Sequence, residues 1–198
     1  MQSIFDFIIK PKSNRYDNTK QIGDTELLLN TEISDHRYVS RVGIVLATPK
    51  HQETEIQVGD EVIVHHNVFR RFYDVYGVEK NSRSYYKEDK YFVKSDQIFL
   101  YKRNNLWYAP EGYCFVKPIE SNNILLEKEI PLRGIIKYID KNLKDINKND
   151  LVGFTPSSEY EFVVDGERLY RVLTNSISIK YERQGNEKEY NPSWAASC

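Results

Sequence analysis

The chain has 198 residues, enough for one large β domain or for two domains of about 100 residues each. Its formal net charge of −1 gives no overall attraction to nucleic acid or to an anionic membrane, and no apolar run is long enough to predict a transmembrane span. The first residues lack the basic segment of a signal peptide, and the two cysteines, Cys114 and Cys198, do not make a disulfide framework. These features predict a cytoplasmic protein in a reducing compartment.

Short runs rich in Val, Ile, Phe and Tyr predict strands along the whole chain, and no stretch has a convincing helical period. In the first half the runs are 4–10, 41–47, 61–65, 91–93 and 97–101. In the second half they are 113–117, 134–139, 151–154, 160–164, 168–173 and 177–181. Asp165-Gly166 predicts a tight hairpin turn, and residues 138–146 allow a short helical turn. We therefore expect an all-β protein.

Segments of the first half recur in the same order in the second half. The matched pairs are 7–11 with 114–118, 41–45 with 132–136, 56–64 with 146–154, and 91–98 with 170–177. A framework that persists while its connections change length is typical of a β scaffold with variable loops, although chance similarity between amphipathic strands is the alternative. We expect one module duplicated in tandem, with domains at 1–104 and 105–183 and a polar, poorly ordered tail at 184–198.

The first half also has a distinctive order of segments. An early strand ends in Ile8-Ile9-Lys10-Pro11, a long polar loop follows, and the strand at 41–47 leads to Val58-Gly59-Asp60 and a run of alternating apolar residues. The closing strand is the segment 91–100, which contains Ser95-Asp96-Gln97-Ile98. This order resembles the GroES-like co-chaperonin family over residues 4–101 and, more faintly, over 112–181. The resemblance implies two tandem small β-barrel modules that cap a GroEL-type chaperonin and assist ATP-dependent protein folding.

Members of that family bind the chaperonin through a mobile loop that carries a short apolar tripeptide. Here the segment between Pro11 and Gly43 takes that position, and its densest apolar spot is Leu27-Leu28-Leu29. The resemblance implies that this tripeptide is the chaperonin-binding site, and the alternative is an extra strand packed on the module's own core. The shorter loop of the second half contains Ile124-Leu125-Leu126, a candidate second contact whose alternative is a simple hairpin.

The resemblance further implies a protein without catalytic activity or a cofactor of its own, because ATP acts on the partner chaperonin. The implied partners are the chaperonin, further copies of the chain in a ring expected to be a heptamer, and an unfolded client protein. Two features depart from the family pattern, since residues 48–56 are short for a roof hairpin and residues 67–90 are long. Reduced roofs and a Lys-, Asn-, Ile- and Tyr-rich composition suggest a bacteriophage protein acting in the host cytoplasm.

The sequence gives little support for a metal site, an enzyme active site or a nucleic-acid-binding site. His65-His66 is a weak metal candidate because adjacent strand residues point to opposite faces, so we expect no metal site. No phosphate-binding glycine loop, nucleophile elbow or Cys/His dyad predicts an enzyme. Residues 65–108 interleave aromatic and basic residues, as single-strand nucleic-acid-binding barrels do, but acidic residues dilute the charge. A role in an interface therefore ranks first, nucleic acid second, and a structural (virion) assembly protein is the third alternative.

Overall fold

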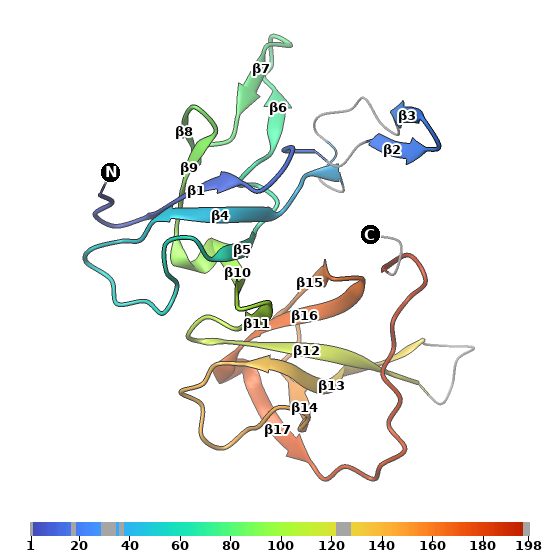
Figure 1. The fold of residues 1–198 in the computed structure, drawn as a ribbon. Coiled ribbons are helices and arrows are strands. Elements are labelled where there is room, and N and C mark those ends of the chain that lie inside the picture. The colour runs from blue at the N-terminus through green and yellow to red at the C-terminus, as the bar shows by residue number, and fades with distance from the viewer. Residues whose placement is uncertain (1, 17–18, 29–34, 36–37, 122–127, 196–198) are drawn as a thin grey trace. The chain divides into compact units, whose positions relative to one another are not determined.

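The computed structural model describes residues 2–16, 19–28, 35, 38–121 and 128–195. Within these ranges the regular structure consists of strands and short 3-10 turns, which confirms the all-β prediction (Figure 1). The chain divides into two compact units, Met1–Leu106 (unit 1) and Trp107–Cys198 (unit 2). Over the same described ranges, no helix has the length and apolar character needed to cross a bilayer.

Unit 1 is built on a seven-stranded sheet with the order β11-β10-β5-β4-β1-β9-β8. Its strands are β1 (Phe7–Pro11), β4 (Val42–Ala47), β5 (Glu61–Val64), β8 (Tyr85–Lys87), β9 (Lys90–Val93), β10 (Ile98–Arg103) and β11 (Leu106–Tyr108), of which β11 continues past the unit boundary at Leu106. Two hairpins lie outside this sheet, β2 (Thr19–Ile22) with β3 (Thr25–Leu28), and β6 (Arg71–Tyr73) with β7 (Glu79–Asn81) (Figure 1). A 3-10 turn at Ser95–Gln97 leads into β10.

Unit 2 is built on a six-stranded sheet with the order β15-β16-β12-β13-β14-β17. Its strands are β12 (Tyr113–Glu120), β13 (Glu129–Ile139), β14 (Leu151–Phe154), β15 (Glu159–Val164), β16 (Glu167–Leu173) and β17 (Ile177–Tyr181). The predicted Asp165-Gly166 turn joins β15 to β16, with positive φ at both residues. The short helix allowed at 138–146 does not form, because β13 runs to Ile139 and the chain then turns around Asp140.

One strand arrangement occurs twice in the chain. The order β10-β5-β4-β1-β9-β8 in unit 1 corresponds strand for strand to β17-β14-β13-β12-β16-β15 in unit 2. The register corresponds as well, since Pro11 lies opposite Gly43 in the first sheet and Pro118 opposite Gly134 in the second. Both central pairs are also irregular at the equivalent step, between residues 8 and 9 and between residues 115 and 116. The sequence matches therefore correspond to equivalent positions in the two sheets.

The same turn precedes β5 and β14. In each, an aspartate side chain accepts a hydrogen bond from the backbone N–H three residues earlier, at 2.8 Å for Asp60 and 2.7 Å for Asp150. The residue before each aspartate has a left-handed conformation, with φ of 93° at Gly59 and 73° at Asn149. Glycine and asparagine tolerate that conformation better than other residues do. The turn thus explains the Gly-Asp and Asn-Asp pairs at matched positions.

The two units have separate apolar cores. The core of unit 1 includes Phe7, Ile9 and Phe69, and Phe69 meets the ring of Tyr91 edge to face with 4.9 Å between ring centroids. In unit 2 the position equivalent to Phe7 is Cys114, which is buried. The remaining buried members of that core are Val116, Ile136, Val152, Phe154 and Val172.

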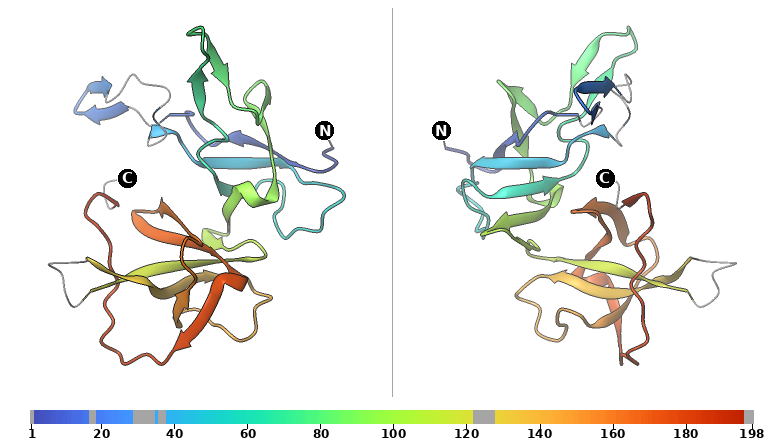
Figure 2. Two further views of the ribbon diagram at one scale, coloured as in Figure 1. Left: turned by 180° about the vertical axis from the view of Figure 1, so that it is seen from behind. Right: turned by 45° about the vertical axis from the view of Figure 1, so that its right-hand side comes forward.

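The C-terminal segment differs from the poorly ordered tail that its composition predicts. The backbone N–H of Glu120 donates to the Lys188 carbonyl at 2.8 Å, and the N–H of Tyr190 donates to the Pro118 carbonyl at 2.8 Å. Ala195 is fully buried. The segment therefore attaches to the end of β12 and can be followed along unit 2 in both views of Figure 2. A polar composition did not reveal this because the attachment combines backbone hydrogen bonds with contacts to residues that are distant in the sequence.

Candidate functional site

The β2–β3 hairpin carries the described part of the predicted docking tripeptide. Within the described part of the chain its strands pair only with each other, with Ile22 opposite Thr25 and Lys20 opposite Leu27. Residues that face each other across an antiparallel pair, and residues two apart along a strand, share a face. Ile22 and Leu27 therefore lie on the same face, and they are 58% and 49% exposed. The hairpin thus presents a small apolar face to solvent.

The structure describes only part of the predicted contact set. Leu27 and Leu28 belong to β3, and the backbone of Leu28 pairs with Thr19. Leu29 and the second candidate contact, Ile124-Leu125-Leu126, lie outside the described residues. The alternative of an added strand is right about strand formation, but Leu27 does not pack in the core of unit 1. Ile22 was missed by the sequence analysis, because only the register of the hairpin shows that it faces the same way as Leu27.

Arg15 and Tyr16 fix the point where the hairpin segment leaves β1. Arg15 donates from Nε and Nη2 to the Phe69 carbonyl at 3.2 and 3.0 Å. The Tyr16 hydroxyl accepts a hydrogen bond from the Arg71 backbone N–H at 2.7 Å. The Arg71 guanidinium also lies 4.9 Å from the centroid of the Tyr16 ring. These contacts hold the root of the segment on the body of unit 1, so the hairpin extends from a fixed base.

A hollow of about 550 Å³ lies at that base. Side chains of both charges line it, including those of Lys10, Arg15, Glu26, Asp89 and Lys90. Its mixed charge gives it no clear preference for an anion or a cation.

Tyr91 is a buried tyrosine in the same unit. Its hydroxyl has no hydrogen-bond partner among the described residues. Burial raises the pKa of Tyr91 to about 12, so the side chain stays a neutral phenol at physiological pH. It therefore acts as core packing under Arg15, whose guanidinium lies 5.4 Å from the centroid of its ring.

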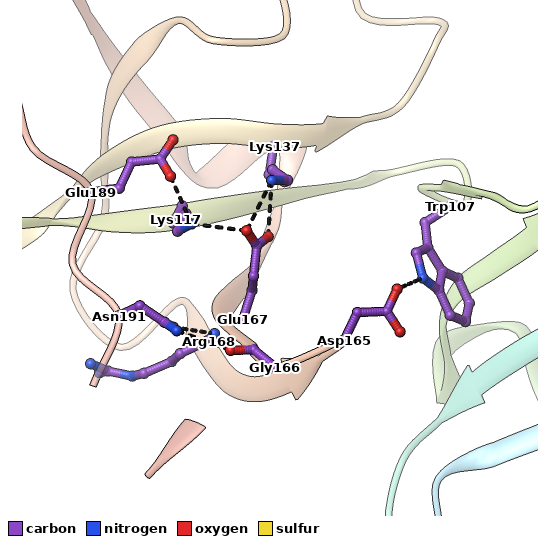
Figure 3. Close-up of polar contacts among 9 residues, drawn as sticks. All are labelled: Trp107, Lys117, Lys137, Asp165, Gly166, Glu167, Arg168, Glu189 and Asn191. Atoms are coloured by element: carbon purple, nitrogen blue, oxygen red, sulfur yellow. Dashed lines mark hydrogen bonds and ion pairs between the residues drawn. The ribbon is translucent and has the colours of Figure 1, made fainter. Parts of the chain in front are cut away.

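In unit 2, an ion-pair network surrounds Lys117 (Figure 3). Its Nζ lies 3.0 Å from Glu167 and 2.7 Å from Glu189, and Lys137 lies 2.9 Å from Glu167. Burial lowers the pKa of Lys117, but hydrogen bonds to Glu189 and Glu167 raise it more, so its net pKa is above the ordinary value. The pKa of Glu167 is lowered because its hydrogen bonds to both lysines outweigh its burial.

These pKa shifts define the role of the network. General acid–base catalysis needs pKa values that move toward neutrality, whereas those of Lys117 and Glu167 move away from it. The network therefore holds permanent charges, and Glu189 uses it to fix the C-terminal segment.

Asn191 adds a second attachment for that segment (Figure 3). Its side chain accepts a hydrogen bond from the Arg168 N–H at 2.9 Å and donates to the Gly166 carbonyl at 2.9 Å. Trp107 Nε1 donates to Asp165 at 2.7 Å on the same turn. The β15–β16 turn is thus held from two sides.

The histidine pair shows no metal-binding arrangement. The rings of His65 and His66 lie 4.2 Å apart by their centroids, and His65 Nδ1 accepts a hydrogen bond from the Asn67 N–H at 3.1 Å. Within the part of the chain that the structure describes, no group of three or more His, Cys, Asp and Glu residues is placed to hold a metal ion.

Comparison with known proteins identifies one distant relative. No protein-family model matches the chain. The uncharacterized protein MJ1285 of Methanocaldococcus jannaschii is 27% identical over 143 residues, which cover 70% of this chain and 67% of that protein. Its name states no activity, so the geometry described above is the basis for a functional proposal.

Proposed function

We propose that the chain is a co-chaperonin, a non-catalytic lid protein that binds a GroEL-type chaperonin and assists ATP-dependent protein folding. The observation that carries the proposal is the β2–β3 hairpin, which pairs with no third strand among the described residues and exposes Ile22 and Leu27 on one face. Exposed apolar side chains on a projecting element are typical of a docking site. An apolar groove on the chaperonin would bury them.

The binding energy of one hairpin is small. Because Ile22 and Leu27 are only about half exposed, their complete burial contributes roughly 0.8–1.5 kcal/mol for each side chain, and ordering the hairpin segment offsets part of that gain. A ring of copies, which we propose to be a heptamer, multiplies the effect because later contacts form at high effective concentration. Weak single contacts then let the lid leave when ATP hydrolysis changes the chaperonin, so the chain itself needs no cofactor.

The duplicated strand order supports a lid with two layers of modules. In this proposal, unit 1 carries the docking hairpin and unit 2 extends the wall around an unfolded client protein. The setting is the cytoplasm, or the host cytoplasm for a bacteriophage protein, and the free, buried thiol of Cys114 suits its reducing conditions. A structural assembly protein is the competing proposal, in which the apolar hairpin joins copies of the chain to each other.

The test is size-exclusion chromatography with light scattering, on mixtures with a purified GroEL-type chaperonin, with and without ATP. We expect nucleotide-dependent co-elution of the wild type, lost in Ile22→Asp and in Leu27→Asp, because these two residues share the exposed face. Leu106→Asp is the matched control, because Leu106 is 61% exposed and lies in β11, outside the hairpin. Leu125→Asp tests the second candidate contact in the same way.

Two results would overturn the proposal. A folded Leu27→Asp variant that binds as the wild type does would remove the hairpin from the mechanism. A wild-type protein that forms a discrete ring but co-elutes with no chaperonin would instead favour the assembly protein.

A further inference from the structure

A second surface of unit 1 lies around β6, β8 and β9. It contains no residue of the β2–β3 docking hairpin. A hollow of about 300 Å³ opens there. The residues that line it include Arg70, Arg83 and Phe72, together with the polar residues Ser84 and Gln97. The hollow therefore combines positive charge with an aromatic wall.

The charges of this region sort into two groups. Three of its carboxylates are held in ion pairs, Glu79 with Arg71 at 2.8 Å, Asp74 with Lys80 at 3.7 Å and Glu88 with Lys90 at 2.7 Å. Arg70 and Arg83 form no ion pair with any residue that the structure describes. Three of the acidic residues that dilute the charge in the sequence are thus engaged with other cations, whereas Arg70 and Arg83 are not neutralised by an ion pair among the described residues.

The side chain of Arg70 also contains an unsatisfied hydrogen-bond donor. Its Nε is buried and has no acceptor among the described residues. A buried donor without an acceptor is costly, and a ligand oxygen in the hollow would satisfy it. Guanidinium groups bind phosphate and carboxylate oxygens in preference to other acceptors. The hollow is therefore suited to an oxyanion.

Exposed rings continue from the hollow across the outer face of β8 and β9. Phe72 is 38% exposed, Tyr86 45% and Phe92 39%. The Tyr86 and Phe92 rings lie 5.0 Å apart by their centroids, and Lys87 Nζ lies 5.3 Å from the centroid of Tyr86. The Phe92 N–H donates to the carbonyl of Ser84 at 2.7 Å, so these rings adjoin the hollow.

We propose that this surface binds single-stranded nucleic acid. A backbone phosphate lies between Arg70 and Arg83, one base stacks on Phe72, and neighbouring bases stack on Tyr86 and Phe92. An acidic peptide would satisfy the two arginines but would leave the row of exposed rings without a stacking partner. Unpaired cations beside consecutive aromatic rings are the pattern of sequence-tolerant single-strand binding.

The test is fluorescence anisotropy of a labelled oligo-dT strand, titrated with the full chain over a range of salt concentrations. We expect log K to fall linearly with log salt. Arg70→Gln/Arg83→Gln should weaken binding at least tenfold and reduce the salt slope by about 0.7, the contribution of the one phosphate that lies between the two arginines. Phe72→Ala should weaken binding by about 5-fold to 100-fold with the slope unchanged, because stacking releases no counterions.

Matched controls separate a site from general charge. Lys144→Gln/Lys148→Gln removes the same charge from unit 2 and should change affinity less than twofold. Arg83→Gln alone covers the risk that loss of the partly buried Arg70 disturbs folding, and far-UV circular dichroism checks each variant. Leu27→Asp should bind oligo-dT as the wild type does, so this proposal and the co-chaperonin proposal fail independently.

Three results would overturn the inference. The first is no binding at low salt. The second is an equal loss in the arginine and lysine double variants, which would show attraction without a site. The third is equally effective competition by poly-glutamate of the same length, which would show that the arginines take an acidic peptide.

Discussion

Gly134 lies opposite Pro118, where β13 approaches β12 closely, and a side chain at this position has no room. An ideal Cβ on residue 134 would overlap the Lys117 carbonyl oxygen and would lie 2.5 Å from Val116 Cγ1. The nearest obstacle is backbone in the middle of the sheet, so it cannot rotate away. We therefore expect Gly134→Ala to push β12 and β13 apart and to destabilise unit 2.

The equivalent glycine of unit 1, Gly43, provides a comparison for the cost in stability of an added methyl group. At Gly43 an added Cβ would lie 3.0 Å from the Lys10 carbonyl oxygen and 3.1 Å from the end of the Phe69 ring. A shift of a few tenths of an ångström relieves those contacts, so Gly43→Ala should cost about 1 kcal/mol. Gly134→Ala should cost about 3 kcal/mol, at the upper end of overpacking effects. For a unit of this size the fall in Tm is roughly 10–20 °C.

Tryptophan fluorescence isolates the unit concerned. Trp194 lies in unit 2, whereas Trp107 lies in β11, the edge strand of the seven-stranded sheet, so the comparison is made in a Trp107→Phe background in which excitation of Trp194 follows unit 2. Gly153→Ala is the control within the same unit, because its Cβ would meet the movable end of the Tyr181 side chain at 3.1 Å. That variant should stay within about 1 kcal/mol of the wild type. If Gly134→Ala lowers Tm no more than Gly153→Ala does, the close approach of β12 and β13 is refuted.

Three further predictions concern stability and reactivity. Glu167 has a folded pKa below its ordinary value of 4.5, so its ion pairs stabilise the protein above that pH and the benefit is lost as the pH falls through the folded pKa. The stability advantage of the wild type over Glu167→Gln in urea titrations should therefore be present at about pH 7 and absent at about pH 3, and an advantage that persists in acid would contradict the pairing. Asp60 is buried and accepts hydrogen bonds from Arg103 at 3.1 and 2.6 Å, so Asp60→Asn should cost about 2 kcal/mol, whereas Asp150→Asn, whose partner Lys180 is exposed, should cost under about 1 kcal/mol. Far-UV circular dichroism in urea titrations measures both free energies of unfolding, and equal losses in the two variants would refute this ranking. Burial raises the pKa of Cys114 to about 11, so iodoacetamide should not modify it in the native protein at about pH 8, and mass spectrometry that finds native labelling would refute its burial.

The repeated framework was predictable because its determinants are local. Gly59-Asp60 and Asn149-Asp150 build the same turn, and each turn fixes where the following strand begins. Pro11 and Pro118 likewise mark equivalent positions opposite a glycine. Alternating apolar residues then determine which side of each strand is buried.

The remaining features depend on contacts between residues that are distant in the sequence. The charge of the surface around Arg70 depends on which carboxylates pair with other cations, and composition cannot show that pairing. The attachment of the C-terminal segment uses Glu189 on Lys117 and Asn191 on Arg168, and neither pair has a local signal. The docking face needed the register of the hairpin, because only pairing shows that Ile22 joins Leu27. Function-bearing surfaces were therefore harder to predict than the framework.

Two sheets with one strand order create a hazard during folding, because β12 resembles β1 and can compete for β4 and β9. Inter-domain misassembly of this kind is characteristic of repeat proteins. Ribosomal synthesis removes the competition, since at about 5–20 residues per second unit 1 has several seconds to form before unit 2 is complete. Unit 2 finishes last of all, because Glu189 and Asn191 lie in its final residues. When the full chain is diluted from denaturant, both units are present from the start and their similar strands compete. We therefore expect more mispaired strands on refolding than on folding during synthesis.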